Sequence, residues 1–366
     1  MNIAVPLPTA DAVRARLRVM IVDDAVVVRG MFSRWIAAEP DLEVVASLRS
    51  GVEALRELPR LKPDVVVLDV DMPDLDGIAA LPQLLQLRRD LVVIMASTLT
   101  RRNAAISLRA LALGAADYIA KPSPRDELDV FRRELIEKIR HLGMRSRTRR
   151  LPKKEIGART PLPISLRPMP LTTPRVLLIG ASTGGPQALE TVLAQMPEVL
   201  ARAPVLITQH MPQTFTAIFA EYLERELGVP VHEAKDGEPV NAGTIYLAPG
   251  GRHMRVVDRG GSPAIAIDNG PAIHFCKPAV DPLFSSAVSV WGPRCLALVL
   301  TGMGQDGLAG ARDLVAAGGH VMAQDEPTSI VWGMPGQVAK AGLCSAVLPL
   351  AEIGPRLSRL FAGEKA

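Results

Sequence analysis

Short apolar segments alternate with amphipathic, helix-like stretches in two separate series along this 366-residue chain. The segments have the length of buried strands, and repeated strand–helix units predict a parallel sheet covered by helices. The first series places strands at Arg18–Val22, Glu43–Ala46, Val65–Asp69, Val92–Ala96 and Asp117–Ala120, and helices at, for example, Gly51–Leu58 and Gly77–Gln86. It predicts a flavodoxin-like α/β domain with a five-stranded parallel sheet.

The second series predicts another α/β domain, of the doubly wound, Rossmann-like type. Its strands are expected at Val176–Gly180, Pro204–Thr208, Thr244–Ala248, Leu296–Thr301 and His320–Ala323. Its helices are expected at Gln187–Gln195, Thr214–Leu227 and Gly307–Ala317. The stretch Pro249–Pro282 is rich in glycine and proline and is interpreted as an inserted hairpin and loop.

A basic, proline-rich segment separates the two series. It carries Arg145, Arg147, Arg149, Arg150, Lys153, Lys154 and Arg159, followed by PLPISLRPMPLTTP. Such a composition cannot bury a core and favours an extended chain. We therefore expect an interdomain linker over residues 141–173, between domains at 17–140 and 174–360. No aromatic residue is interleaved for base stacking, which argues against a nucleic-acid-binding segment.

Composition excludes several classes of protein. Hydrophobic residues make up 48% and charged residues 22%, as in globular chains, and the net charge of +4 gives no reason to expect a nucleic-acid partner. The three cysteines are widely spaced without a CxxC pair, which argues against a disulfide framework or a zinc site. No apolar run has membrane-spanning length, and the N-terminus has prolines where a signal peptide is apolar, so we expect a short leader on a cytoplasmic protein without membrane insertion.

Carboxylates gather at the predicted strand ends of the first domain. Asp23 and Asp24 close the first strand and Asp69 closes the third. The carboxyl ends of parallel strands share one edge, where these charges would repel one another unless a cation neutralised them, and oxygen ligands in small number suit Mg²⁺. Ser97 ends the fourth strand and Lys121 follows the last, so both are expected at the same edge.

This pattern, with the segment VLDVDMPDLDG, resembles the receiver domain of response regulators. The resemblance implies that Asp69 is the phosphoacceptor and that Mg²⁺ is held by the three carboxylates and the backbone carbonyl of Asp71. It implies that Ser97 and Lys121 contact the phosphoryl oxygens and that Tyr118 is the aromatic switch residue. A histidine kinase of the chemotaxis type is then the expected phosphodonor.

VLLIGASTGGP, at the start of the second domain, is typical of a buried strand, a glycine-rich turn and a helix start. Gly180-Ala-Ser182-Thr-Gly184 fits the G-x-S-x-G pattern, in which small neighbours expose a nucleophilic serine. The same turn resembles a loop that binds phosphate or a dinucleotide through close backbone approach. The turn alone leaves both interpretations open, because a nucleophile needs a base and an orienting acid.

Two histidines compete for the role of base. His210 follows the predicted strand PVLITQ, at the same sheet edge as Ser182, whereas His320 begins a strand and belongs at the opposite edge. The other histidines have no evident strand-end placement or lie by the linker: His141, His232, His253 and His274. Geometry therefore favours a pair of Ser182 and His210.

The acid is expected in the loop LALVLTGMGQDG, which places Asp306 after another strand at the same edge. Its glycines free the backbone of Met303 to direct an N–H at a developing oxyanion. Ser182 would attack, His210 would take and return its proton, and Asp306 would orient the imidazole. Four other acids are less well placed: Asp258, Asp268, Asp281 and Asp325.

The motifs GASTGGP, ITQHMP, YLAPGG, KPAVDPLF and TGMGQDG, after a receiver-like domain, resemble the CheB family of chemotaxis protein-glutamate methylesterases. The resemblance implies hydrolysis of glutamate γ-methyl esters on methyl-accepting chemotaxis receptors, with release of methanol, and deamidation of receptor glutamines. It implies that Ser182, His210 and Asp306 are the catalytic triad, with the Met303 backbone in the oxyanion hole and Thr183 in support, and that the catalytic domain needs no cofactor.

The family resemblance also implies that the receiver covers the active site until it is phosphorylated. The chain departs from the usual family pattern at CKPAVD, where Cys276-Lys277 and Ala279 stand near positions more often held by Arg and Ser. A different class, a receiver-controlled nucleotide-binding or non-catalytic module, predicts an acid after the second strand, which ends in Gln209-His210 instead. A transcription factor would carry a compact C-terminal DNA-binding segment, and the long strand–helix alternation argues against one.

Overall fold

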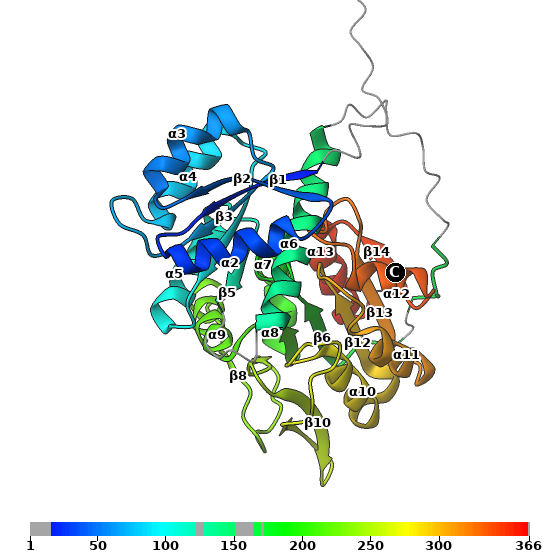
Figure 1. Ribbon diagram of the computed structural model, residues 1–366. Coiled ribbons are helices and arrows are strands. Elements are labelled where there is room, and N and C mark those ends of the chain that lie inside the picture. Colours follow the sequence, from blue (N-terminus) through cyan, green and yellow to red (C-terminus); the bar gives the residue numbers. More distant parts are fainter. Residues whose placement is uncertain (1–15, 122–127, 151–163, 170–171, 365–366) are drawn as a thin grey trace, which may run out of the picture. The chain divides into compact units, whose positions relative to one another are not determined.

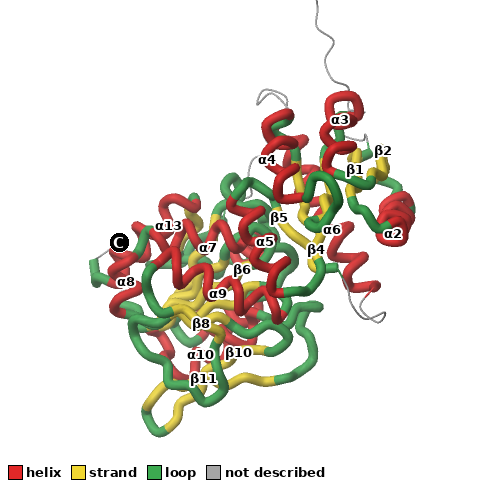
Figure 2. Tube along the Cα trace, turned by 90° about the vertical axis from the view of Figure 1, so that its left-hand side faces the viewer, coloured by secondary structure: helices red, strands yellow, loops and turns green. Residues whose placement is uncertain are grey.

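A computed structural model describes residues 16–121, 128–150, 164–169 and 172–364 (Figure 1). The chain forms two compact units, and each is described by itself. Both contain a parallel sheet and helices that connect most of its strands, which Figure 2 shows in yellow and red. The predicted α/β class is therefore confirmed. None of the described helices combines the length and the apolar character that crossing a membrane requires.

The five-stranded sheet has the order β2-β1-β3-β4-β5, and all its strands are parallel. The elements of this part of the chain are β1 (Leu17–Val22), α2 (Val26–Ala37), β2 (Leu42–Leu48), α3 (Gly51–Leu61), β3 (Val65–Asp69), α4 (Gly77–Leu87), β4 (Val92–Ser97), α5 (Arg101–Ala112), β5 (Asp117–Ala120) and α6 (Leu128–Arg150). β3 and β4 are buried throughout, as central parallel strands covered on both faces must be. This is the flavodoxin-like sheet expected from the sequence.

Helix α6 begins after residues 122–127, which lie outside the described residues, and runs into the segment predicted as a linker. It packs against α2, where the rings of Phe32 and Phe131 stack with centroids 5.5 Å apart. Leu142 is buried, and Arg147 pairs with the carboxylate of Asp64 at 2.6 Å. The prediction of a linker from residue 141 is therefore wrong over 141–150, because apolar residues among the arginines give this helix a buried face. Of the rest, residues 151–163 and 170–171 lie outside the described residues.

The seven-stranded sheet has the order β14-β13-β12-β6-β7-β9-β8, again with every pair parallel. Its part of the chain contains β6 (Val176–Ala181), α7 (Gly185–Ala194), α8 (Pro197–Arg202), β7 (Val205–Gln209), α9 (Gln213–Leu227), β8 (Val231–Glu233), β9 (Ile245–Leu247), β10 (His253–Arg259), β11 (Ser262–Asp268), α10 (Val280–Trp291), β12 (Cys295–Val299), α11 (Leu308–Ala316), β13 (His320–Gln324), α12 (Met334–Lys340), β14 (Ala346–Leu348) and α13 (Leu350–Phe361). The strand order runs outward from β6 in both directions. The sheet is thus doubly wound, and its switch point lies between β6 and β12.

Helices cover both faces of this sheet, with α7, α8, α9 and α13 in one group and α10, α11 and α12 in another. The predicted hairpin in the insertion is β10 with β11, an antiparallel pair. The sequence patterns missed α8, α10, α12, α13, β8 and β14. Of these, α8, α12, β8 and β14 are short, whereas α10 and α13 have 12 residues each and include a proline. Since ligands bind α/β sheets at the carboxyl ends of the strands near a switch point, the loops after β6, β7 and β12 are the place to look for a site.

Candidate active site and phosphorylation site

Ser182 stands on a tight turn between β6, which ends at Ala181, and α7, which begins at Gly185. Its N–H donates to the Thr301 carbonyl at 3.0 Å. Its own carbonyl accepts from the Gly185 N–H at 2.7 Å and from the side-chain amide of Gln209 at 3.0 Å. The backbone of the turn is therefore held by two neighbouring strand ends, while the serine side chain is only half-buried.

Two glycines allow the chain to come close at this turn. Gly184 adopts φ +72°, and a Cβ there would meet the Ile330 side chain at 2.5 Å. A Cβ at Gly302 would lie 2.8 Å from the Cβ of Ser182. The loop that follows β12 thus passes directly beside the serine, which requires the absence of a side chain at Gly302.

This loop carries Met303, one residue beyond the close approach. Within the described part of the chain, its N–H donates no hydrogen bond. Thr183 is buried, and its carbonyl accepts a 2.9 Å hydrogen bond from the hydroxyl of Thr301. An unpartnered backbone N–H one residue beyond this close approach is a candidate donor to an oxyanion.

His210 follows β7, at the same edge of the sheet as Ser182. The ladder pairs Ala181 with Gln209, so Ser182 and His210 come next on adjacent strands, and the His210 N–H donates to the Ala181 carbonyl at 3.0 Å. Among the described residues, no hydrogen bond joins the Ser182 hydroxyl to His210. Such contacts often form only when substrate binds. His320 begins β13 and therefore lies at the opposite edge.

Asp306 is almost fully buried and contacts the imidazole: its Oδ2 lies 2.8 Å from His210 Nε2. Three backbone N–H groups also donate to this carboxylate, from Val280 at 2.6 Å, Asp281 at 3.0 Å and Gly307 at 2.9 Å. Val280 and Asp281 begin α10, so the carboxylate caps that helix N-terminus, where negative charge is favoured. Burial raises the pKa of Asp306, but His210 and the backbone donors outweigh it and the net pKa is lowered.

Cys276 is a residue of this site to which the sequence patterns assigned no role. Burial lowers the pKa of His210, whereas the interaction with Cys276, together with the contact to Asp306, raises it to well above the ordinary 6.5. Cys276 lies in the insertion, far along the chain from His210, so spacing could not connect the two. The available signal was its position just before KPAVD, whose last two residues donate to Asp306.

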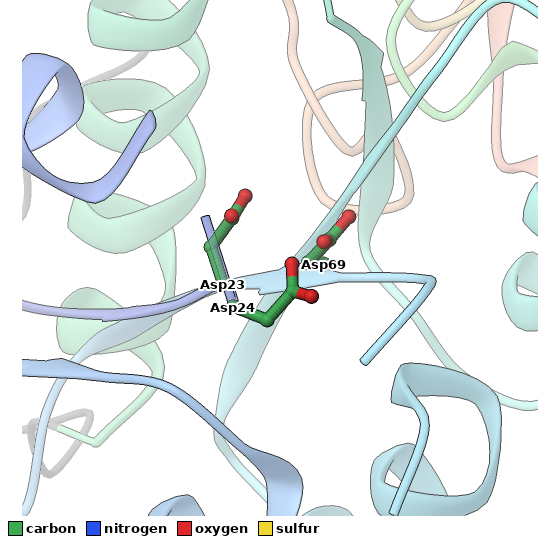
Figure 3. Close-up of side chains that lie close together, drawn as sticks. All are labelled: Asp23, Asp24 and Asp69. Atoms are coloured by element: carbon green, nitrogen blue, oxygen red, sulfur yellow. The ribbon is translucent and has the colours of Figure 1, made fainter. Parts of the chain in front are cut away.

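The acid cluster of the five-stranded domain forms as expected from the strand ends. Asp23 and Asp24 follow β1 and Asp69 ends the adjacent β3, and their side chains gather at one place (Figure 3). Each offers a carboxylate oxygen within 4.8 Å of the others. Lys121 Nζ lies 2.6 Å from Asp23 Oδ2 and 2.7 Å from Asp69 Oδ1.

Asp69 is buried in this cluster, and its burial changes the pKa of the carboxyl group. Burial raises its pKa to about 6; Lys121 acts in the opposite direction, and the charge of Asp23 adds to the rise. Burial and the charge of Asp23 thus disfavour the ionised form of Asp69 even beside a lysine. A small divalent cation with oxygen ligands would relieve this repulsion, so the residues present fit Mg²⁺.

The remaining predicted receiver residues lie near this edge or under it. Ser97 ends β4 fully buried, and its carbonyl accepts from the Lys121 N–H at 2.6 Å. Tyr118 is buried on β5, with Lys138 Nζ 5.3 Å from the ring centroid, and burial raises its pKa well above 10.0. Asp71, just after β3, is exposed.

Together these features define a two-part protein: a domain of the response-regulator receiver type and an α/β domain with the groups that serine hydrolases use. Comparison with known proteins gives the family. Residues 19–131 match the response regulator receiver domain, and residues 177–357 match the CheB methylesterase family. With the full-length relatives described next, these matches show that the chain belongs to the CheB methylesterase family.

The chain is similar to curated proteins over nearly its whole length. A "protein-glutamate methylesterase/protein-glutamine glutaminase" of Rhodopseudomonas palustris (strain HaA2) is 58% identical, covering 96% of this chain and 95% of the relative. A protein with the same name from Nitrobacter hamburgensis is 57% identical, with 100% of both chains covered. The crystal structure of the CheB methylesterase catalytic domain of Thermotoga maritima is 36% identical, with a TM-score of 0.50, and covers 52% of this chain and 100% of that domain.

Proposed function

We propose that this protein hydrolyses glutamate γ-methyl esters on methyl-accepting chemotaxis receptors, releasing methanol, and deamidates receptor glutamines. Membership of the CheB methylesterase family supports the reaction. The observation that carries the mechanism is the 2.8 Å contact between His210 and Asp306 at the sheet edge where Ser182 stands on its turn. We place the reaction in the cytoplasm, where a kinase could also reach the receiver.

The chemistry follows from which atoms are already engaged. A carboxylate only accepts, so Nε2 of His210 donates to Asp306 and Nδ1 is left as the basic nitrogen. His210 Nδ1 takes the Ser182 proton as the hydroxyl oxygen attacks the ester carbonyl carbon. The oxyanion is stabilised by the Met303 N–H, and the backbone around Thr183 supports the turn.

The intermediate then collapses and the glutamyl–methoxy bond breaks. His210 returns its proton to the departing methoxide, which leaves as methanol, and the glutamyl group stays esterified to Ser182. His210 next deprotonates a water that attacks this ester, which frees the glutamate side chain and restores the serine. With a glutamine substrate the same steps release ammonia in place of methanol.

Phosphorylation of the receiver domain regulates this activity. The Asp69 carboxylate attacks the phosphorus of a phosphohistidine on a chemotaxis-type kinase. Asp23, Asp24 and Asp69, with the Asp71 carbonyl, would hold Mg²⁺, which supplies positive charge for the phosphoryl oxygens. Lys121 and Ser97 contact those oxygens, and Tyr118 acts as the switch residue.

Methanol release from methylated receptor membranes tests the proposal. Ser182→Ala and His210→Ala should each abolish release while the protein remains folded, and full activity in Ser182→Ala would overturn the assignment of the nucleophile. A phosphodonor with Mg²⁺ should raise the wild-type rate, and Asp69→Asn should remove that rise while leaving basal hydrolysis. A nucleotide-binding module would instead bind nucleotide and release no methanol.

A further inference from the structure

The YLAPGG motif and the histidine that follows it have no role in the chemistry above. They contact the segment that leads to the backbone amides bonded to Asp306. His253, at the start of β10, is 1% exposed. Its Nδ1 accepts a hydrogen bond from the Ala279 N–H at 3.1 Å, and its Nε2 lies 3.0 Å from the Pro271 carbonyl oxygen. One buried ring therefore joins both ends of the segment 271–279.

These partners determine the state of the ring. The Ala279 N–H can only donate and the Pro271 carbonyl can only accept. His253 must therefore be a neutral imidazole, with its proton on Nε2 and the lone pair of Nδ1 on the amide. A second bond strengthens the same junction, because the Gly251 N–H donates to the Lys277 carbonyl at 3.0 Å.

The held segment leads directly to the catalytic acid. Ala279 is the N-cap of α10, and the next two residues, Val280 and Asp281, donate their N–H groups to the Asp306 carboxylate. The side chain of Ala279 makes no cap of its own. The position of these two donors therefore depends on what holds the Ala279 amide, and that is His253. β10 and α10 pack against each other, as their positions in Figure 1 indicate.

We infer that His253 is a positioning residue of the active site: its Nδ1 holds the start of α10 so that two backbone amides orient Asp306, and through it His210. This inference rests on the proposed function for its rate measurements but not for its structural ones. His253 itself bonds to backbone groups on both sides of its ring, so it acts through Asp306 rather than on the substrate.

Two substitutions separate the role of the acceptor from that of the ring. Asn places an oxygen as many bonds from Cα as Nδ1 is, so His253→Asn can still accept from Ala279. Gln places its amide nitrogen where Nε2 was, so His253→Gln can still donate to Pro271 but offers Ala279 nothing. Ser286→Ala is the matched control, because the Ser286 hydroxyl accepts from the Val256 N–H at 3.0 Å and so also joins α10 to β10, away from Asp306.

Methanol release, measured with the full-length chain, should show a kcat that falls about 10-fold to 100-fold in His253→Gln, since small displacements of catalytic groups have effects of this size. KM should change less than about twofold, because substrate contacts are not altered. The kcat of His253→Asn should stay within about threefold of the wild-type value, and the kcat of Ser286→Ala should equal the wild-type value. A wild-type kcat in His253→Gln, or equal losses in both His253 variants, would overturn the inference.

Two further measurements do not depend on the natural substrate. The rate at which a fluorophosphonate labels Ser182 should fall in His253→Gln and stay near the wild-type rate in His253→Asn. If the wild-type chain were labelled but released no methanol, the proposed function would fail. The difference in labelling rate between the two variants would still test the role of His253. In the unaltered chain, ¹⁵N spectra of the histidines should show His253 neutral with its proton on Nε2. A proton on Nδ1 would contradict the inference even if His253→Gln did not fold.

Discussion

The Nε2 atom of His210 lies 2.8 Å from Oδ2 of Asp306, although 96 residues separate the two in the chain. The contact arises because both follow strands of one parallel sheet and so reach its carboxyl edge. The carboxylate that receives the imidazole is already held by three backbone donors, two of them from the start of α10. Its orientation is therefore determined before any substrate arrives.

Asp306→Asn should lower kcat for methanol release by roughly two to four orders of magnitude, less than Ser182→Ala. Both oxygens of the Asp306 carboxylate accept hydrogen bonds from N–H groups. In the Asn variant one of these oxygens becomes an NH₂ group, which would face N–H donors and could not accept from them. With the NH₂ at the Oδ2 position, His210 would have to accept at Nε2 and carry its proton on Nδ1, which removes the base. Asp313→Asn, in α11, is a matched control. Wild-type turnover in Asp306→Asn would contradict this role.

The rate should depend on pH through His210. Its pKa is raised well above 6.5 by Cys276 and Asp306 despite burial, and only the neutral imidazole can take the Ser182 proton. kcat/KM should therefore increase with pH along a limb above pH 6.5. The stability of the fold should change with pH in the opposite direction. Protonated His210 stabilises the folded state fully at pH values below its pKa in the unfolded chain, and this contribution is lost as pH rises through its pKa in the folded chain.

Cys276→Ala should move that limb to lower pH, because it removes one of the interactions that raise the His210 pKa. The measurement is the pH profile of kcat/KM for wild type and variant under the same conditions. Cys344→Ala is the control, since Cys344 is a buried core residue. An unchanged limb in Cys276→Ala would show that the thiol does not interact with the His210 imidazole in solution.

Much of this site could be predicted because the sequence shows where the strands end. Buried apolar runs show where a strand stops, and parallel strands bring their last residues together, which places Ser182, His210 and Asp306 at one edge. Val280 and Cys276 could not be placed this way. They belong to an insertion rich in glycine and proline, whose position depends on tertiary bonds such as that of His253 to Ala279 rather than on a local repeat.

The linker prediction failed for a related reason. The helix that continues through residues 141–150 looks like a solvated basic tether because charge dominates its composition. Its buried face is formed by a few apolar residues such as Leu142, and Arg147 finds a partner in Asp64 that no local pattern reveals. Composition averages over a segment, whereas burial is decided by which face of the helix each residue occupies.

Asp69→Asn should stabilise the receiver domain at pH 8 by about 1–3 kcal/mol. The folded-state pKa of Asp69 is raised from 3.8 to about 6, mainly by burial, so folding favours the protonated carboxyl and ionisation opposes it. This stability is present at low pH and lost as pH rises through about 6. The advantage of Asn should therefore shrink below pH 6. Thermal unfolding of the full chain at several pH values measures it, with the exposed Asp129→Asn as control.

Removal of divalent cations should abolish stimulation by a phosphodonor while leaving basal hydrolysis unchanged. The three carboxylates at the receiver edge lie close enough to share one cation, whereas the proposed catalytic steps use only protein groups and water. Methanol release measured with a small acyl phosphate, with EDTA, and after Mg²⁺ is restored tests this. Stimulation that persists in EDTA would contradict a metal requirement for phosphorylation.

We expect the hydroxyl of Thr301 to help hold the serine turn in position. The side chain is fully buried, donates to the Thr183 carbonyl at 2.9 Å and accepts from the Val331 N–H at 2.9 Å, while its own carbonyl receives the Ser182 N–H. Thr301→Val keeps the shape but leaves two buried backbone groups unpaired, which costs about 1–3 kcal/mol of stability and should lower kcat as the turn shifts.

Thr301→Ser provides the comparison, because it keeps both hydrogen bonds and loses only a methyl group. Its stability should fall by about 1 kcal/mol, but its kcat for methanol release should stay near wild type. Thermal unfolding and turnover measured together separate the two effects, since only Thr301→Ser loses packing and only Thr301→Val loses the two hydrogen bonds. If Thr301→Val kept the wild-type kcat, the turn would be positioned by its backbone bonds without this hydroxyl.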